Sequence, residues 1–215
     1  MLVINGVCYI FGAAGGLPSS FKKNDGDLII AADAGYKHLS EYGVFPDIAV
    51  GDFDSLGYVP NCAEIIKHPV RKDDTDTMLA VKTGLERGYK RFVIYGGVGG
   101  RTDHTLANLQ TLSYLSNRGA VGFLCGDGVT YTAVTNSKLR FKACSRGTVS
   151  VFSATSVCEG VYISGLSYEL SGAALKFDFP VGVSNEFCGK PSEIGVKSGT
   201  LIVCWSGNLN LVDEW

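Results

Sequence analysis

The sequence lacks several features that would assign it to a familiar class. Its seven cysteines form no Cys-x-x-Cys pair, and most lie in apolar runs, where thiols behave as small hydrophobic side chains. This usage favours a reducing, cytoplasmic location over a disulfide-bonded one. The three histidines show no zinc-like spacing. No segment is long and apolar enough to span a bilayer, and the apolar N-terminus lacks a basic leader, so we expect strands there rather than a signal peptide.

Charge is scarce as well. A formal charge of -2 without a cluster of Lys and Arg argues against a nucleic-acid surface, so a small-molecule substrate is expected. The P-loop pattern GxxxxGK[ST] is absent, and "GAAGG" at 12–16 has the wrong spacing for a dinucleotide fingerprint. With 46% apolar residues, the 215-residue chain is nevertheless globular and long enough for one large or two small domains.

The first part of the chain alternates short apolar runs with amphipathic stretches. In the stretch after Asp76, Met78, Val81 and Leu85 follow helical spacing and Gly88 provides a stop. A second such stretch, "TDHTLANLQTLSYLSNRG", carries leucines at 106, 109, 112 and 115. Near-continuous apolar strands joined by such helices predict a parallel sheet covered on both faces.

The pattern of apolar and polar residues changes after about residue 127. Helical periodicity disappears, and short alternating runs are separated by Gly, Ser and Asn, which predicts antiparallel strands. In "LKFDF" we expect Leu175, Phe177 and Phe179 to share one face of a half-solvated sheet in a sandwich or barrel. Two domains are therefore predicted, with a boundary near residue 128.

Acidic residues follow several of the predicted strands. Asp33 ends "LIIAAD", Asp52 and Asp54 end "IAVGDFD", "KDDTD" at 72–76 opens a helix, and 96–104 joins a strand to the next helix. Ligands bind outside the carboxyl ends of the strands in an open parallel sheet, so these segments should meet at one rim. Gathered carboxylates repel one another unless a cation neutralises them, and Mg²⁺ with substrate phosphates fits such oxygen ligands.

The segment "GGVGGR" adds features that suit a phosphate. Its glycines let the backbone approach phosphate oxygens, the following helix start favours anions, and Arg101 can hold phosphate with two parallel bonds. Taken singly, an Asp at a strand end is usually a cap or turn former, Lys72 and Arg101 are ordinary surface charges, and His104 is either a helix-start residue or catalytic. Convergence of all these segments on one rim favours the site.

Four motifs, "AADAG", "GDFDS", "KDDTDTMLAV" and "GGRTDHTLAN", occur in the order and spacing of thiamine pyrophosphokinases, and the chain resembles that family over nearly its whole length. "GLSYEL" and "GVSNEF" are similar to its thiamine-binding half. The resemblance implies diphosphate transfer from ATP to thiamine with release of AMP. It also implies a doubly wound, mostly parallel, Rossmann-like α/β domain (1–128), then an all-β sandwich (129–215), in a homodimer with composite sites.

The resemblance also assigns residues, motif by motif. It implies magnesium ligands at Asp52, Asp54 and Asp76; ATP-binding positions at Asp33, Lys72, Thr75, Gly97 and Arg101; catalytic roles for Asp76, Arg101 and Asp103; and a thiamine pocket at Leu166, Tyr168, Ser184 and Asn185. The general base is either Asp76 or Asp103. Tyr168 stands where eukaryotic members commonly have Trp, and Leu79 where they often carry Lys, a pattern that looks more bacterial.

Two other functions fit parts of the sequence. "GDFDS" imitates the DxD signature of haloacid-dehalogenase-like phosphatases, with Asp52 as nucleophile, although that signature normally ends the first strand. A protein that only binds a nucleotide or thiamine is the non-enzymatic alternative. Thiamine-dependent formation of AMP separates both from the transferase.

Overall fold

The computed structural model describes residues 4–18, 21–54, 56–67 and 73–215. The chain divides into two compact units, one formed by residues up to Thr111 together with Leu124–Asp127, the other by Leu112–Phe123 together with Gly128–Trp215. Within the described residues, helices long and apolar enough to cross a membrane are absent.

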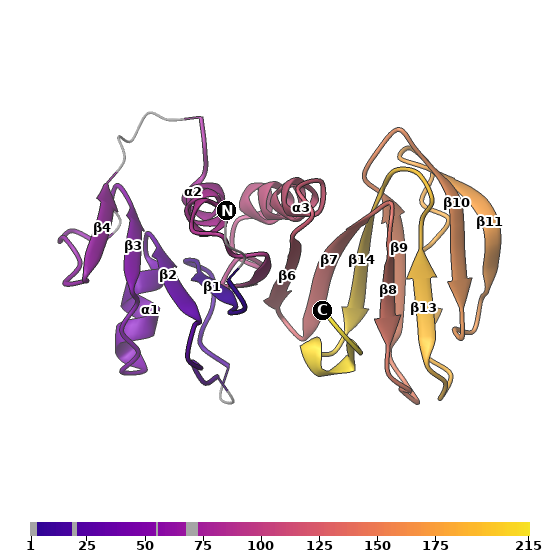
Figure 1. Ribbon diagram of the computed structural model, residues 1–215, viewed down its shortest axis with the longest axis horizontal. Coiled ribbons are helices and arrows are strands. Elements are labelled where there is room, and N and C mark those ends of the chain that lie inside the picture. The colour runs from indigo at the N-terminus through magenta and orange to yellow at the C-terminus, as the bar shows by residue number, and fades with distance from the viewer. Residues whose placement is uncertain (1–3, 19–20, 55, 68–72) are drawn as a thin grey trace. The chain divides into compact units, whose positions relative to one another are not determined.

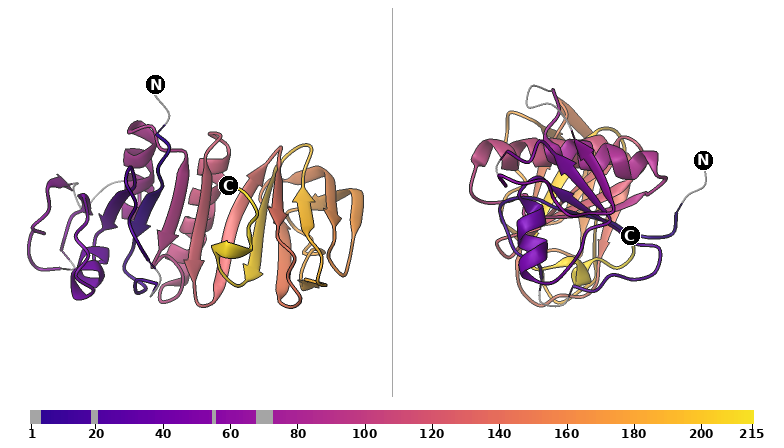
Figure 2. Two further views of the ribbon diagram at one scale, coloured as in Figure 1. Left: turned by 60° about the horizontal axis from the view of Figure 1, so that its bottom comes forward. Right: turned by 90° about the vertical axis from the view of Figure 1, so that its left-hand side faces the viewer.

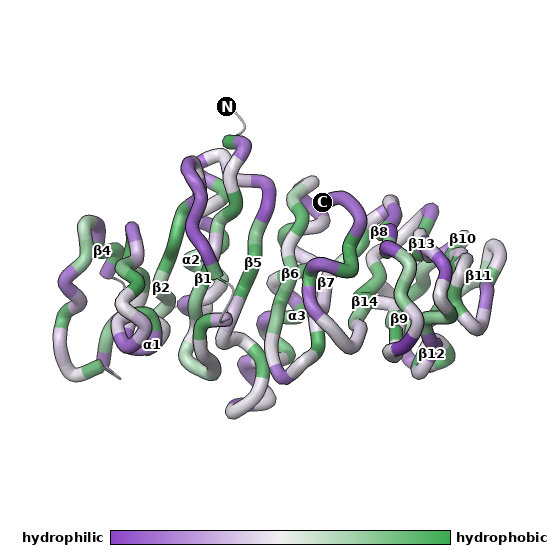
Figure 3. The backbone as a smooth tube through the Cα atoms, turned by 90° about the horizontal axis from the view of Figure 1, so that it is seen from below, coloured by the Kyte–Doolittle hydropathy of each residue, from purple (hydrophilic) through white to green (hydrophobic). Residues whose placement is uncertain are grey.

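The first unit contains a parallel sheet in the order β5-β1-β2-β3-β4. These strands span Arg91–Tyr95 (β5), Cys8–Phe11 (β1), Leu28–Ala32 (β2), Ile48–Gly51 (β3) and Glu64–Lys67 (β4), and β6 is Val121–Gly126. Every residue of β2 and β3 is buried, as the strongly hydrophobic tube of β2 in Figure 3 illustrates. The predicted parallel α/β unit is confirmed.

Helices lie on both faces of this sheet. Helix α1 (Gly35–Glu41) covers one face, and α2 (Asp76–Glu86) covers the other (Figures 1 and 2). The side chain of Thr75 caps α2 by accepting a 3.2 Å hydrogen bond from the Met78 N–H, and the helix ends before Gly88, whose φ is +90°. The start and stop predicted for this helix are therefore confirmed.

Helix α3 spans Thr102–Ser116, and its four leucines do not share one buried face. Leu112 and Leu115 are buried, whereas Leu106 is 59% exposed. Each step of three residues falls about 60° short of a full turn, so three steps carry the side chain roughly halfway around the helix. The spacing thus predicts the helix but not a single buried leucine face.

The second unit is built from antiparallel strands. One group pairs in the order β12-β9-β14-β7 and the other in the order β11-β10-β13-β8. The strands are β7 (Val129–Thr135), β8 (Lys138–Phe141), β9 (Thr148–Ser153), β10 (Val157–Ser164), β11 (Leu170–Lys176), β12 (Asn185–Glu186), β13 (Ser192–Gly195) and β14 (Thr200–Ser206). A short 3₁₀ helix, η1 (Leu209–Leu211), follows β14.

Aromatic rings join the two groups of strands within this unit. Phe141 of β8 lies 5.1 Å from Trp205 of β14 and 5.3 Å from Phe187, between ring centroids in each case. Phe141 and Trp205 are almost fully buried. The predicted change from alternating helices and strands to antiparallel strands is therefore confirmed.

The expectation for "LKFDF" is wrong. Leu175 is buried, but β11 ends at Lys176, and the chain turns over Phe177 and Asp178. Phe177 and Phe179 are 73% and 66% exposed, because the alternation of a strand no longer governs their direction after it ends.

Candidate active site

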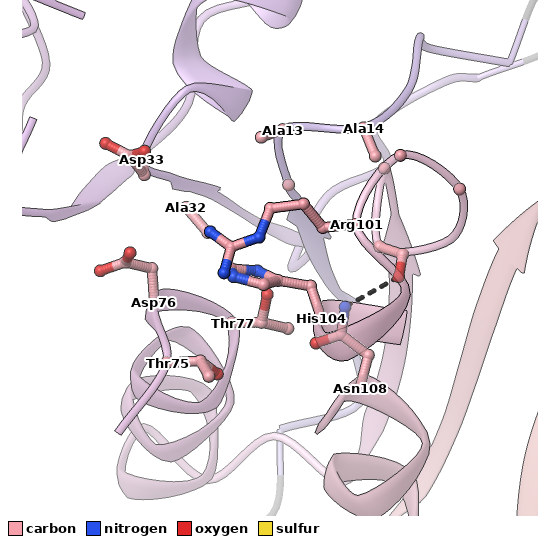
Figure 4. A pocket seen from close by; sticks show the side chains of 15 residues that line it. Ala13, Ala14, Ala32, Asp33, Thr75, Asp76, Thr77, Arg101, His104 and Asn108 are labelled. Carbon is pink, nitrogen blue, oxygen red and sulfur yellow. Dashed lines mark hydrogen bonds between the residues drawn. The ribbon is translucent and has the colours of Figure 1, made fainter. Parts of the chain in front are cut away.

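A pocket of about 320 Å³ opens at the carboxyl ends of β1, β2 and β5 and the starts of α2 and α3, all within the first unit (Figure 4). Open parallel sheets bind ligands at this edge. The pocket is lined by Gly12, Ala13, Ala14, Ala32, Asp33, Thr75, Asp76, Thr77, Gly96, Gly97, Gly99, Gly100, Arg101, His104 and Asn108.

Two glycine-rich loops form one wall. The Gly12 N–H donates to the Tyr95 carbonyl (2.8 Å), and the Ala14 N–H donates to the Gly96 carbonyl (2.9 Å). Gly96 has a φ of +66°, and a Cβ there would lie 2.4 Å from the Gly12 carbonyl oxygen, so only glycine fits. The "GAAGG" segment, dismissed as a dinucleotide fingerprint, thus lies beside the predicted phosphate loop.

The loop at 12–14 has a second attachment. His38 of α1 lies with Nε2 at 2.9 Å from the Ala13 carbonyl oxygen, within hydrogen-bond distance. A carbonyl can only accept, so Nε2 carries the proton. Helix α1 therefore fixes a residue that lines the pocket, a role for which the sequence alone gives no signal.

Two of the predicted acidic residues line the pocket, Asp33 and Asp76. Asp33 follows β2 directly and has a φ of +46°, a strained conformation of the kind that gathers at functional sites. Asp76 opens α2 immediately after the cap residue Thr75. Asp74, the preceding acid of "KDDTD", pairs instead with Lys82 at 2.6 Å.

Arg101 and His104 extend toward the side of the pocket on which Asp33 and Asp76 lie (Figure 4). The Arg101 side chain is 71% exposed and pairs with Asp103, Nη2 to Oδ2, at 2.6 Å. That hydrogen bond holds the pKa of Asp103 below its usual range and raises the pKa of Arg101. A lowered pKa makes Asp103 a weaker base.

Asp52 and Asp54 stand after β3, the neighbour of β2. The Asp54 N–H donates to Asp52 Oδ1 at 3.0 Å, a local turn bond, and Phe53 between them is buried with a φ of +62°. A Cβ on Gly51 would lie 3.2 Å from the Asp33 Cα, so this loop begins beside Asp33.

The predicted rim is therefore only partly assembled. Among the described residues, the set that lines the pocket leaves out Asp52, Asp54 and Asp103, and groups of three or more side chains able to hold a metal ion are absent. Lys72, predicted to contact ATP, lies outside the described residues.

The four predicted thiamine-binding residues lie in the second unit. Leu166 is buried and forms a β-bridge with Phe187, whereas Tyr168 is 70% exposed. Ser184 has a φ of +61°, and its N–H donates to Ser150 Oγ at 3.0 Å. The segments around 166–168 and 184–187 are thus held together.

Asn185 joins these two segments through its side chain. Its Oδ1 accepts from the Tyr168 N–H (2.9 Å) and the Glu186 N–H (2.9 Å), and its Nδ2 donates to the Tyr168 carbonyl (2.6 Å). The residue is buried. Both the oxygen and the nitrogen of the amide therefore hydrogen-bond to the backbone of Tyr168.

Comparison with known proteins identifies the family. A family model described as the thiamin pyrophosphokinase catalytic domain matches residues 22–121, and one described as the thiamin pyrophosphokinase vitamin B1 binding domain matches residues 136–201. The chain belongs to the thiamine pyrophosphokinase family. The two matches fall on the parallel and the antiparallel parts of the chain, respectively.

Individual relatives agree with this family. The chain is 36% identical over 91 residues to the thiamine pyrophosphokinase of Bacillus subtilis, a match covering 40% of this chain and 42% of that protein. It is 25% identical over 174 residues to thiamin pyrophosphokinase 1 of Caenorhabditis elegans, covering 74% and 69%. The aligned stretch thus spans less than half of the bacterial relative.

Solved structures of the family share the fold over almost the whole chain. The crystal structure of thiamine pyrophosphokinase from Bacillus subtilis matches with a TM-score of 0.80 at 23% identity, covering 95% of this chain and 100% of that one. A thiamin pyrophosphokinase family protein from Enterococcus faecalis matches with a TM-score of 0.75 at 26% identity, covering 94% and 99%.

Proposed function

We propose that this protein transfers the diphosphate group of ATP to the hydroxyl of thiamine, giving thiamine diphosphate and AMP. The observation that carries the proposal is a pocket, in a chain matched by both the catalytic and the vitamin B1 binding models, that joins two glycine loops to Arg101, Asp33 and Asp76. Such a pocket suits a polyphosphate, because backbone N–H groups and a guanidinium bind anionic oxygens well.

Several lining residues are given a role in this reaction. The thiamine hydroxyl attacks the β-phosphorus and AMP leaves, so catalysis consists mainly of alignment and charge neutralisation. Arg101 binds the transferring group, with Thr75 and the Gly97 loop beside it. Asp76 is the preferred general base, since it lines the pocket whereas the pKa of Asp103 is held low by Arg101.

Magnesium fits the available donors. Asp52, Asp54 and Asp76 offer only carboxylate oxygens, the hard ligands that Mg²⁺ prefers, and Mg²⁺ needs only one or two of them when phosphate and water complete its shell. The Asp52 loop begins beside Asp33, at the edge of the sheet where the pocket opens. Bound Mg²⁺ would neutralise charge on the phosphates of ATP.

The second unit is proposed to bind thiamine. We take residues 1–128 as a Rossmann-like catalytic domain and 129–215 as a β-sandwich that carries the thiamine pocket at Leu166, Tyr168, Ser184 and Asn185. The rings of Phe141 and Trp205, which contact each other across the two strand groups, support a sandwich core. The exposed Tyr168 ring is available to stack on a planar ligand.

We also propose a homodimer in which a second copy completes each site. Phe177, Phe179, Val181 and Val183 are exposed within one short segment, as interfaces require. Mixing Asp52→Asn with Tyr168→Ala protein under subunit exchange should restore roughly a quarter of wild-type activity, because about half of the dimers are mixed and each holds one intact site. Exchange without recovery would assign the site to a single chain.

The direct test is thiamine-dependent formation of AMP from ATP in Mg²⁺, with Arg101→Ala as the inactive control. The comparisons lend no support to the two alternatives. A phosphatase would release inorganic phosphate from a phosphoester without ATP, and its DxD signature would end the first strand, whereas Asp52 here follows β3. A binding protein would retain ATP or thiamine without turnover.

Seven free cysteines, all in the described part of the chain, support a cytoplasmic site of action.

A further inference from the structure

Asn108 is a buried polar residue of α3 that lines the pocket. Its Nδ2 donates a 2.8 Å hydrogen bond to the Gly97 carbonyl, drawn as the dashed line in Figure 4. The bond joins the second turn of the helix to the loop that leads into the same helix. His104 and Asn108 lie four residues apart on α3, so they share the helix face toward the pocket, and Arg101 immediately precedes the helix.

The fit between Asn108 and the loop is close on both sides. A Cβ at position 97 would lie 2.8 Å from Asn108 Nδ2 and 2.7 Å from Leu124 Cδ1, so any side chain there would displace the amide. The next link runs through Gly96, whose carbonyl accepts the Ala14 N–H at 2.9 Å. Asn108 therefore fixes the loop at 96–100, and the loop at 12–14 is hydrogen-bonded to that loop.

The loop needs such an attachment. Gly96, Gly99 and Gly100 all have positive φ, and glycine has more conformational freedom than any other residue. An unattached loop would therefore lose much conformational entropy when it binds an anion. A buried hydrogen bond from a rigid helix reduces that loss before the ligand arrives.

We propose that Asn108 is a positioning residue that holds the loop Gly96–Gly100 in its phosphate-binding shape and thereby sets the affinity for ATP. The assignment of ATP rests on the proposed function. Asn108 acts through the Gly97 carbonyl and not on thiamine, so the affinity for thiamine should be independent of it.

Substitutions that remove only the donor test this role. Asn108→Asp keeps the shape but cannot donate to the carbonyl when ionised, and Asn108→Ala removes the donor without adding charge, in case the first variant does not fold. Thr111→Val is the matched control, since Thr111 is also buried on the same helix and its hydroxyl donates to the Ala107 carbonyl of that helix, at 3.0 Å, rather than to the loop.

The expected result is a KM for ATP raised roughly 10-fold in the Asn108 variants, the size expected for one lost buried hydrogen bond, with the KM for thiamine changed less than about 2-fold. Thr111→Val should leave both values near wild type. Equal increases in both KM values, or an effect matched by Thr111→Val, would overturn the proposal.

Hydrogen exchange of the loop amides gives a readout that needs no activity. The amides of 97–100 should exchange faster in the folded Asn108 variants than in wild type or Thr111→Val, and ATP should slow them less. Unchanged loop exchange would refute the positioning role. Wild-type protein that forms no AMP would instead refute the proposed function, while the exchange measurement would still decide the role of Asn108.

Discussion

Replacing Asn185 by Ala should destabilise the second unit and, through Tyr168, weaken thiamine binding. The side chain makes three hydrogen bonds, two at 2.9 Å and one at 2.6 Å, to the backbone of Tyr168 and Glu186. Each contributes about 1 kcal/mol net, and water can replace part of that beside the exposed Tyr168, so the free energy of unfolding should fall by about 2–3 kcal/mol.

Urea unfolding followed by circular dichroism measures this change, provided that the m-value stays constant. Ser150→Ala is the control, because it removes only the bond that Ser150 Oγ accepts from the Ser184 N–H and a weaker one with the Cys204 thiol, and should cost about 1 kcal/mol. Asn185→Asp retains the two bonds accepted by Oδ1 and loses the donated one, so its stability should fall between the other two variants.

Calorimetric titration with thiamine completes the test. In the absence of urea, where the variant is still folded, Asn185→Ala should bind thiamine more weakly than wild type. Tyr168→Ala should also weaken binding but should not lower the free energy of unfolding, since that ring is 70% exposed. If Asn185→Ala kept wild-type stability and lost only thiamine affinity, the amide would act on the substrate directly, and the assignment of its bonds to the backbone would be refuted.

Three further predictions concern charged residues. Asp52→Asn should abolish turnover, measured as AMP release, while the thermal midpoint stays at or above that of wild type, because a carboxylate beside others is removed; near-normal turnover at ordinary Mg²⁺ would contradict it. Arg101→Lys should lower kcat on the order of 10²-fold, because lysine keeps the positive charge but lacks the paired N–H donors of the guanidinium. An unchanged kcat with a higher KM for ATP would show instead that Arg101 only binds ATP and does not stabilise the transition state. Glu193, whose pKa is lowered to about 2 chiefly by the hydrogen bond from Arg140, stabilises the fold above about pH 4.5 and loses that effect as the pH falls toward 2. Glu193→Gln should therefore flatten the dependence of unfolding free energy on pH in that window, and an unaltered slope would be inconsistent with the pairing.

Local patterns in the sequence were enough to predict the parallel unit and the antiparallel strands that follow it. Thr75, Met78 and Gly88 illustrate why, since caps, helical spacing and a glycine stop act over a few residues and need no distant partner. Phe177 and Phe179 illustrate the limit. Their alternation with charged residues is typical of a strand, yet the end of β11 at Lys176 turned them to solvent.

The candidate site was predictable to the extent that strand ends locate it. Asp33, Asp76 and Arg101 meet at the pocket because parallel strands deliver their carboxyl ends to one edge. Contacts set by tertiary packing were not predictable. Neither the bond from Asn108 to the Gly97 carbonyl nor the use of both ends of the Asn185 amide by the backbone of Tyr168 has a signal in the order of residues.

The most direct test of the central claim is phosphorus NMR of the purified protein incubated with ATP, Mg²⁺ and thiamine. Diphosphate transfer predicts that AMP and thiamine diphosphate appear together in equal amounts, that both the β- and γ-phosphorus of ATP are retained in the thiamine product, and that omitting thiamine stops the reaction. Formation of ADP with thiamine monophosphate, release of inorganic phosphate without thiamine, or persistence of ATP with bound thiamine would contradict the assignment.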